Sequence, residues 1–198
     1  MSGTDLTTRT LHADALAPFL PTLGRLRVAV FREWPYLYDG DAAHEGSYIR
    51  NFAGSPNAAA VLAFDGEAVV GAATCQPMAE TSPELQASFA AGGLPPAECC
   101  YFGESVLLPP YRGRGLGLAF LAGREAHARA LGLTRVAFVS VKRDADDPRR
   151  PPDYVPLDGF WKKRGYRPRY DIVVRMSWKE VDGWMEEPHE LSAWVKDL

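Results

Sequence analysis

The hydrophobic pattern of the chain alternates short apolar runs with longer amphipathic segments. Six runs are apolar, short and bounded by turn residues, as strands are: 7–12, 58–64, 68–75, 100–108, 136–141 and 172–178. Asp65-Gly66 separates the second run from the third and has the composition of a tight hairpin turn. Hairpins combined with strand–helix alternation predict a mixed α/β sheet.

Helical character fills most of the intervals between these runs. The pattern predicts helices at 13–33, 41–52, 116–131 and 157–164. Gly132 ends the third of them. Along that helix four alanines share one narrow side, which would let the helix lie close to a sheet: Ala119, Ala122, Ala126 and Ala130.

Length and composition favour one globular domain. The 198 residues are 46% apolar, enough for a core of ordinary density, so we expect residues 1–198 to form a single domain. Residues 179–198 are expected to be a C-terminal extension whose Trp184 and Trp194 dock on the protein or serve a homodimer contact.

Charge and cysteine usage exclude several classes of protein. The formal net charge of −3 argues against a general nucleic-acid binder. Because no apolar run could span a bilayer, we expect no membrane partner and a soluble, cytoplasmic protein. Cys75, Cys99 and Cys100 fit neither a disulfide framework nor zinc spacing, and the histidines are scattered, so no metal site is predicted.

The most informative segment is Arg112-Gly113-Arg114-Gly115-Leu116-Gly117, which follows an apolar strand and opens a helix. Alternating glycines expose backbone N–H groups, and the helix N-terminus adds its free amides and dipole, so the segment suits a phosphate. A Walker loop would require Lys-Ser/Thr where Leu118-Ala119 stand, and a dinucleotide loop would require glycine at Leu118.

Written as Arg112-x-x-Gly115-x-Gly117, the segment resembles the acetyl-CoA-binding motif of the GNAT superfamily of N-acetyltransferases. A second block, Phe160 to Tyr166, is similar to the Phe-Tyr-x-x-x-Gly-Phe sequence of that family. The resemblance implies a GNAT-like α/β fold. Its mixed, mostly antiparallel sheet would have about six to seven strands flanked by helices, splayed at the cofactor strand 100–108.

The resemblance also implies that acetyl-CoA is the acetyl donor and that no metal takes part. Val106, Leu107 and Leu108 would contact the pantetheine chain, and the Leu107 N–H would polarise the thioester carbonyl. The phosphates would lie on the glycine-rich segment: Arg112, Gly113, Arg114, Gly115, Leu116 and Gly117.

Glu104 is the candidate general base. An acid inside an otherwise apolar strand is costly to bury unless its charge has a partner or a function. Its spacing from Leu107 would let it face the same cleft, directly or through a water. The alternative is that Glu104 only pairs with a nearby arginine or caps a loop.

The candidate acid is Tyr154. The family tyrosine that often protonates the thiolate is replaced here by Trp161, whose indole has no useful proton. Tyr154 stands where an asparagine is expected before Phe160, and it could serve as acid. It could equally be an ordinary loop tyrosine, and the thiolate could leave unaided.

In this architecture the first loops face the cleft and should recognise the amine acceptor. Trp34, Tyr36, Tyr38 and Glu45 form an aromatic and acidic set suited to an ammonium, although packing would explain them as well. The interval 77–98 looks like an insertion that covers the acceptor site or is a plain surface excursion, and Ser82 would cap a short helix in it.

We therefore predict an N-acetyltransferase that moves acetyl from acetyl-CoA to a small-molecule or peptide amine by direct attack in a ternary complex. Two alternatives remain open. The first is a non-catalytic acyl-CoA sensor of the same fold, and the second is a nucleotide-binding regulatory domain that uses the glycine loop for another phosphate.

Overall fold

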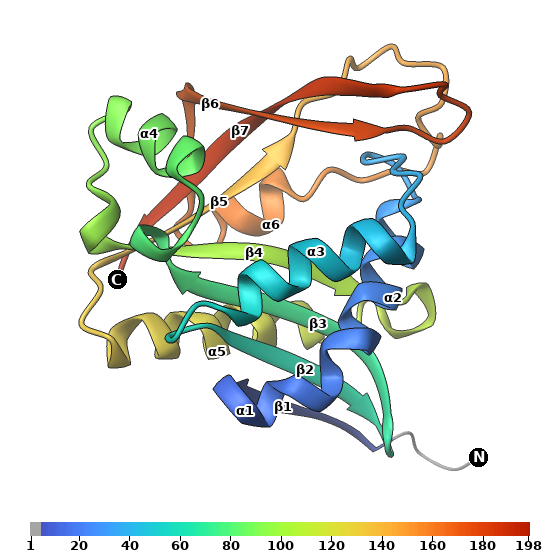
Figure 1. The fold of residues 1–198 in the computed structure, drawn as a ribbon. Coiled ribbons are helices and arrows are strands. Elements are labelled where there is room, and N and C mark those ends of the chain that lie inside the picture. The colour runs from blue at the N-terminus through green and yellow to red at the C-terminus, as the bar shows by residue number, and fades with distance from the viewer. Residues whose placement is uncertain (1–4) are drawn as a thin grey trace.

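A twisted sheet runs through the centre of the molecule (Figure 1). The computed structural model describes residues 5–198, apart from the side chains of residues 13, 14, 42–44 and 47. In this part of the chain seven strands pair in the order β1-β2-β3-β4-β5-β7-β6, all antiparallel except β4 with β5. The strands are β1 Leu6–His12, β2 Ala59–Asp65, β3 Ala68–Pro77, β4 Cys99–Leu107, β5 Arg135–Val141, β6 Arg167–Lys179 and β7 Glu186–Asp197. The predicted mixed, mostly antiparallel sheet is confirmed.

The predicted splay at the cofactor strand is confirmed too. β4 and β5 pair at only three positions, from Cys99–Arg135 to Tyr101–Ala137. β4 then continues to Leu107 along β3, while β5 pairs with β7 over its whole length. The two strands therefore part after Tyr101, and the sheet opens between them.

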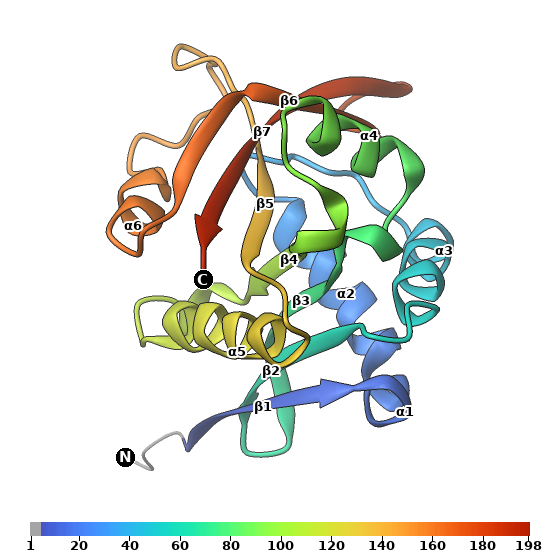
Figure 2. The same ribbon diagram turned by 90° about the vertical axis from the view of Figure 1, so that its left-hand side faces the viewer.

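Helices cover both faces of the sheet (Figure 2). α2, α3 and α4 lie over one face, where α2 and α3 share a core with β2 and α4 packs on β6. α5 and α6 lie over the other face. The helices are α1 Ala13–Leu16, α2 Leu20–Phe31, α3 Ala42–Ala53, α4 Pro83–Ala91, α5 Leu116–Ala130 and α6 Asp158–Lys162, with short 3-10 turns between some of them. None of the helices in the described residues is long and apolar enough to cross a membrane.

The segment predicted as one helix over 13–33 is divided. α1 ends at Leu16, a 3-10 turn spans Ala17–Phe19, and α2 begins at Leu20. Pro18 and Pro21 are the second residues of the turn and of α2. Proline has no N–H to donate and its ring obstructs a helix that continues from the preceding turn, so each proline starts a new helix.

The predicted contact of the α5 alanine side with the sheet is wrong. Ala122, Ala126 and Ala130 are exposed, and Gly123 makes the close approach instead: a Cβ on Gly123 would lie 2.7 Å from Val61 Cγ2. The neighbouring face of α5 carries larger side chains and buries more apolar area, so that face turns to the sheet.

The C-terminal segment is built into the sheet. Residues 186–197, expected in an extension, form β7 between β5 and β6. Trp194 packs in the core at 2% exposure, as predicted. Trp184 lies in the β6–β7 turn at 97% exposure, so the expectation that it docks on its own chain is wrong, while the expected homodimer contact stays a prediction.

We predict that Gly123→Ala destabilises the fold, because its methyl group would overlap Val61 and the side chain of Thr10. Overpacking of this kind costs about 1–3 kcal/mol, which urea unfolding would measure. Gly159→Ala is the matched control, since a Cβ on this helical glycine meets nothing within 4 Å. Equal stability of the two variants would contradict the close approach of α5.

Candidate functional site

A β-bulge turns Glu104 toward the face of the sheet that α2 and α3 cover. Thr74 of β3 stands opposite two residues of β4, Gly103 and Glu104. The Thr74 hydroxyl accepts a hydrogen bond of 3.2 Å from the Glu104 N–H. Because side chains alternate along a strand, the extra residue shifts the phase and places Glu104 on the same face as Tyr101. Without the bulge Glu104 would point toward α5.

Glycine is required at position 103 for this geometry. A Cβ on Gly103 would lie 2.5 Å from Thr74 Oγ1 and 3.5 Å from the Tyr48 hydroxyl. The hydroxyl of Thr74 can therefore reach the Glu104 N–H only when residue 103 has no side chain.

Glu104 belongs to a buried ionic cluster with Arg27 and Glu45. Its Oε2 accepts hydrogen bonds from Arg27 Nη1 at 2.7 Å and from the Tyr48 hydroxyl at 2.8 Å. Arg27 Nε donates to Glu45 Oε2 at 2.5 Å. Glu104 is 4% exposed and Glu45 is 2% exposed. The ion pair of Glu104 with a nearby arginine, which was the alternative role expected from the sequence, is thus present. The single positive charge of Arg27 is shared between the carboxylates of Glu45 and Glu104.

The cluster raises the pKa of both Arg27 and Tyr48. Burial disfavours the charge of Arg27, but the carboxylates of Glu104 and Glu45 outweigh it and raise the pKa of Arg27. Although 36% of Tyr48 stays exposed, desolvation and the charge of Glu104 raise the pKa of its phenol well above the usual value. Tyr48 therefore stays a proton donor to Glu104 at neutral pH.

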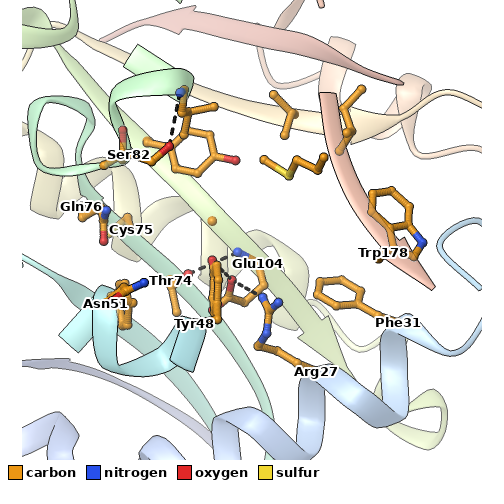
Figure 3. A pocket seen from close by; sticks show the side chains of 18 of the residues that line it. Arg27, Phe31, Tyr48, Asn51, Thr74, Cys75, Gln76, Ser82, Glu104 and Trp178 are labelled. Carbon is orange, nitrogen blue, oxygen red and sulfur yellow. Dashed lines mark hydrogen bonds and ion pairs between the residues drawn. The ribbon is translucent and has the colours of Figure 1, made fainter. Parts of the chain in front are cut away.

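Glu104 lines a cavity of about 430 Å³. Glu104 Oε1 is buried and has no hydrogen-bond partner, and the same is true of Gln76 Oε1, which lines the cavity with it. Figure 3 shows Asn51, Thr74 and Gln76 on one side of Glu104, and Phe31 and Trp178 on the other. The cavity thus has a polar and an aromatic side.

The acceptor set predicted from the first loops is only partly assembled. Tyr36 and Tyr38 line the cavity, and burial raises the pKa of Tyr36 to about 12. Glu45 lies in the ionic cluster with Arg27. Trp34 is not among the lining side chains and packs edge-on against Tyr154, with ring centroids 6.1 Å apart.

The interval 77–98 contributes to the cavity wall. The Ser82 side chain accepts from the Leu85 N–H and caps α4, as predicted. Glu80, Ser82 and Leu85 all line the cavity. The part of the insertion from the 3-10 turn Met78–Glu80 to the start of α4 therefore borders the candidate acceptor site, rather than projecting from the surface.

The glycine-rich segment forms an open cradle at the N-terminus of α5. Gly113 and Gly115 have φ of +74° and +86°, and a Cβ on either would meet nothing within 4 Å. Gly115 precedes the first residue of α5, and no side chain caps the helix. The first amides of α5 and the space over the glycines are thus available to an anion. Phe160 of α6 lies 3.5 Å from a Cβ placed on Gly117.

The backbone of Leu107 faces the gap between β4 and β5. The next N–H, that of Leu108, bonds to Val70 O of β3. Because N–H groups alternate between the two edges of a strand, the Leu107 amide points to the opposite edge. Arg112 Nε donates to Leu107 O at 3.1 Å on that edge.

The Arg112 side chain is tied to the protein on both sides. Besides Leu107 O, it binds Glu33 through a two-pronged ion pair of 2.8 and 3.1 Å. Its guanidinium therefore holds the loop against the end of α2. Because the side chain is engaged in this way, we expect the backbone of Arg112, rather than its guanidinium, to contact a phosphate. Arg114 lies over the Tyr111 ring at 5.8 Å.

Tyr154, the candidate acid, is half-buried beside Trp34 and Arg150. Burial and the charge of Asp158 raise its pKa. It does not line the cavity that holds Glu104. Trp161 packs against Phe138 and Trp194, with ring centroids 4.9 Å apart in both pairs, so it serves the core on the α5 side of the sheet.

Several lining residues were not predicted from the sequence: Arg27, Tyr48, Thr74, Gln76 and Tyr101. Arg27 did have a signal, because it occupies the turn of α2 that carries the buried Leu23 and Leu26. A cation there needs a buried partner. The others have no local signal, since their position depends on the bulge and on packing of α3.

We predict that Gly103→Ala destabilises the fold by about 1–3 kcal/mol, because its methyl group would push Thr74 out of place. Thr74→Ala removes the clashing hydroxyl. The double variant should therefore recover stability that Gly103→Ala alone loses, in thermal and urea unfolding. No recovery would contradict the bulge geometry.

Comparisons with known proteins agree with this architecture. The model of the acetyltransferase (GNAT) family matches residues 25–151, more than half of the chain. The search of curated proteins found no match to this chain. Similar solved structures include a ribosomal-protein-alanine N-acetyltransferase from Brucella melitensis, with 15% identity, 96% of this chain and 99% of that one covered, and a TM-score of 0.61.

Two further structures have the same fold. A GCN5-related N-acetyltransferase from Kribbella flavida is 18% identical, with 98% of both chains covered and a TM-score of 0.59. The PaiA N-acetyltransferase from Thermoplasma acidophilum, solved in complex with coenzyme A, is 12% identical over 98% of this chain and 99% of that one, with a TM-score of 0.56. With the matched family model, the splayed sheet and the open glycine cradle, the chain belongs to the acetyltransferase (GNAT) family and is an acyltransferase.

Proposed function

We propose that this protein transfers acetyl from acetyl-CoA to an amine by direct attack in a ternary complex, with Glu104 as general base. One observation carries the proposal. Glu104 lines a cavity next to the gap between β4 and β5, and its Oε1 is buried and lacks a hydrogen-bond partner. A carboxylate held in this way can accept a proton from an amine in the cavity.

The residues present fit a CoA thioester as the donor. The phosphates would lie over Gly113 and Gly115, where no Cβ intrudes, and against the first amides of α5. The pantetheine would follow Val106, Leu107 and Leu108 along the gap. When bound, acetyl-CoA supplies an acyl carbon activated by its thioester.

Each protein group then has a defined task. The amine nitrogen bonds to the acetyl carbon, the carbon–sulfur bond breaks, and the proton lost by the amine goes to Glu104. The Leu107 N–H points into the gap and donates to the carbonyl oxygen as negative charge develops there. Arg27 and Tyr48 hold Oε2 of Glu104, which leaves Oε1 to receive the proton.

Tyr154 is the proposed proton donor to the departing thiolate. Its raised pKa keeps the phenol protonated at neutral pH. Since it lies beside Trp34 and does not line the Glu104 cavity, it would act from outside that cavity. Because thiols have a pKa of about 8–9, the thiolate can also leave without this proton, and Tyr154→Phe separates the two routes.

An acyl-CoA sensor without turnover is the second candidate. It is favoured by Trp161, which takes the place of the family tyrosine and packs in the core. Both candidates require acetyl-CoA to raise the melting temperature. Release of CoA thiol with a panel of amines distinguishes them, because a sensor releases none.

We predict that Glu104→Gln lowers kcat about 10²–10⁴-fold at neutral pH, since the amide keeps the shape but cannot take a proton. Affinity for acetyl-CoA, measured by calorimetry, should change less than about 3-fold, because binding involves other groups. Glu67→Gln, on the exposed β2–β3 turn, removes the same charge and should keep full activity. An unchanged rate for Glu104→Gln would exclude Glu104 as the base.

We predict that Gly115→Val weakens acetyl-CoA binding at least 10-fold. Its φ of +86° is unfavourable for a β-branched residue, and its side chain would occupy the open cradle. Gly132→Val is the control, because it has a φ of +73° at the other end of α5 and the same open space. Similar losses of CoA affinity in both variants would indicate that strain, not the cradle, is responsible.

A further inference from the structure

The buried ionic cluster beside the cavity carries excess negative charge. Arg27 contributes one formal positive charge, and Glu45 and Glu104 contribute one negative charge each, which leaves −1 among the side chains that are paired on the cavity side of the sheet. The other buried cation nearby, Arg124 of α5, attracts Glu104 from a distance, but its guanidinium bonds to the backbone oxygens of Thr74 and Glu104 and not to the carboxylate. Glu104 lines the cavity, and its Oε1 has no hydrogen-bond partner. A buried uncompensated charge is expensive, so the cluster favours a ligand that brings a positive charge to this oxygen.

The cavity offers no comparable site for an anion. Among its described lining residues Arg27 is the only cation, and its guanidinium is bound by Glu45 and Glu104. Glu80, the other charged lining residue, is an acid that accepts hydrogen bonds from Asn57 and Ser55. A carboxylate on the acceptor would therefore face like charges without a counter-ion, which reduces affinity.

The opposite wall is apolar and aromatic. Phe31, Met176 and Trp178 line it, together with Val139 and Leu191. Trp178 is fixed, because its indole N–H donates to Tyr36 O at 3.1 Å. On the polar side, Gln76 Oε1 is a second buried acceptor without a donor. A primary ammonium has three N–H donors, which matches a cavity with unpaired acceptors.

We infer that the acceptor is a small primary amine without a carboxylate, whose ammonium binds Glu104 and whose apolar, ring-sized body packs on the wall of Phe31, Met176 and Trp178. This inference rests on the proposed function. The cavity of about 430 Å³ lies in the range of small-molecule sites, which are about 300–1,000 Å³. Glu104 thus binds the protonated amine. The ammonium releases one proton to solvent before attack, and Glu104 accepts the proton that the neutral amine loses as the carbon–nitrogen bond forms.

A panel of four amines tests each part of the inference on the full chain with acetyl-CoA. 2-Phenylethylamine has the ring and no carboxylate, phenylalanine adds only the carboxylate, ethylamine lacks only the ring, and a tripeptide with an N-terminal alanine represents a peptide acceptor. We expect kcat/KM for 2-phenylethylamine to exceed that for ethylamine about 10–100-fold, from burial of the ring. It should exceed that for phenylalanine and the tripeptide by at least about 100-fold.

A variant of the apolar wall locates the ring. Met176→Ala should raise KM for 2-phenylethylamine about 3–10-fold and leave KM for ethylamine unchanged. Met185→Ala makes the same change at a residue that is 68% exposed and outside the cavity lining, and it should alter neither value. Melting temperatures of both variants identify any loss of folding. A Met176→Ala variant that affects both amines equally would overturn the placement of the ring.

The outcomes separate this inference from the proposed function. Equal or faster turnover of phenylalanine, ethylamine or the tripeptide would overturn the inference while leaving the acetyltransferase proposal intact. No turnover of any amine, although acetyl-CoA stabilises the protein, would overturn the proposed catalysis. In that case tryptophan fluorescence still measures binding of the amines, and weaker binding of 2-phenylethylamine than of phenylalanine would overturn the inference as well.

Discussion

The short pairing of β4 with β5 is the constraint on which the rest of the structure depends. β5 is bound along its whole length by β7, and β4 is bound by β3, so each strand keeps a partner after the two separate at Tyr101. The backbone groups on the facing edges, the Leu107 amide among them, are then left for another partner. Such groups are rarely left without a hydrogen-bond partner in a protein interior. An extended ligand along the gap, such as the proposed pantetheine, would supply these hydrogen bonds.

The bulge in β4 converts this gap into a candidate reaction site. Gly103 allows Thr74 to bind the spare amide, and the shift of phase brings Glu104 to the side of Arg27 and Tyr48. Buried ion pairs contribute little to stability, because desolvation opposes the Coulomb attraction. We therefore relate the cluster of Arg27 with two carboxylates to the proposed role of Glu104 as base rather than to stability. It holds one oxygen of Glu104 and leaves the other without a partner.

Much of the fold could be predicted because its signals are local. The Asp65-Gly66 hairpin, the strand 100–108 and the stop at Gly132 follow from turn chemistry and from runs of apolar residues. The glycine-rich segment was informative for the same reason. Gly113 and Gly115 adopt positive φ in the loop before α5, and glycine is the residue type that adopts positive φ without strain. Pro18 and Pro21 divide the helix predicted over 13–33, and their positions in the sequence were enough to predict this division.

The sequence by itself determined the family, the cradle and the presence of an acid in the strand at position 104. Only the tertiary structure decided which face that acid occupies, that Arg27 and Tyr48 bind it, that Gly123 rather than the alanines meets the sheet, and that residues 186–197 complete the sheet. The physical reason is that the phase of a side chain depends on cross-strand register. A single bulge reverses that phase, and its position is set by contacts between segments distant in the sequence.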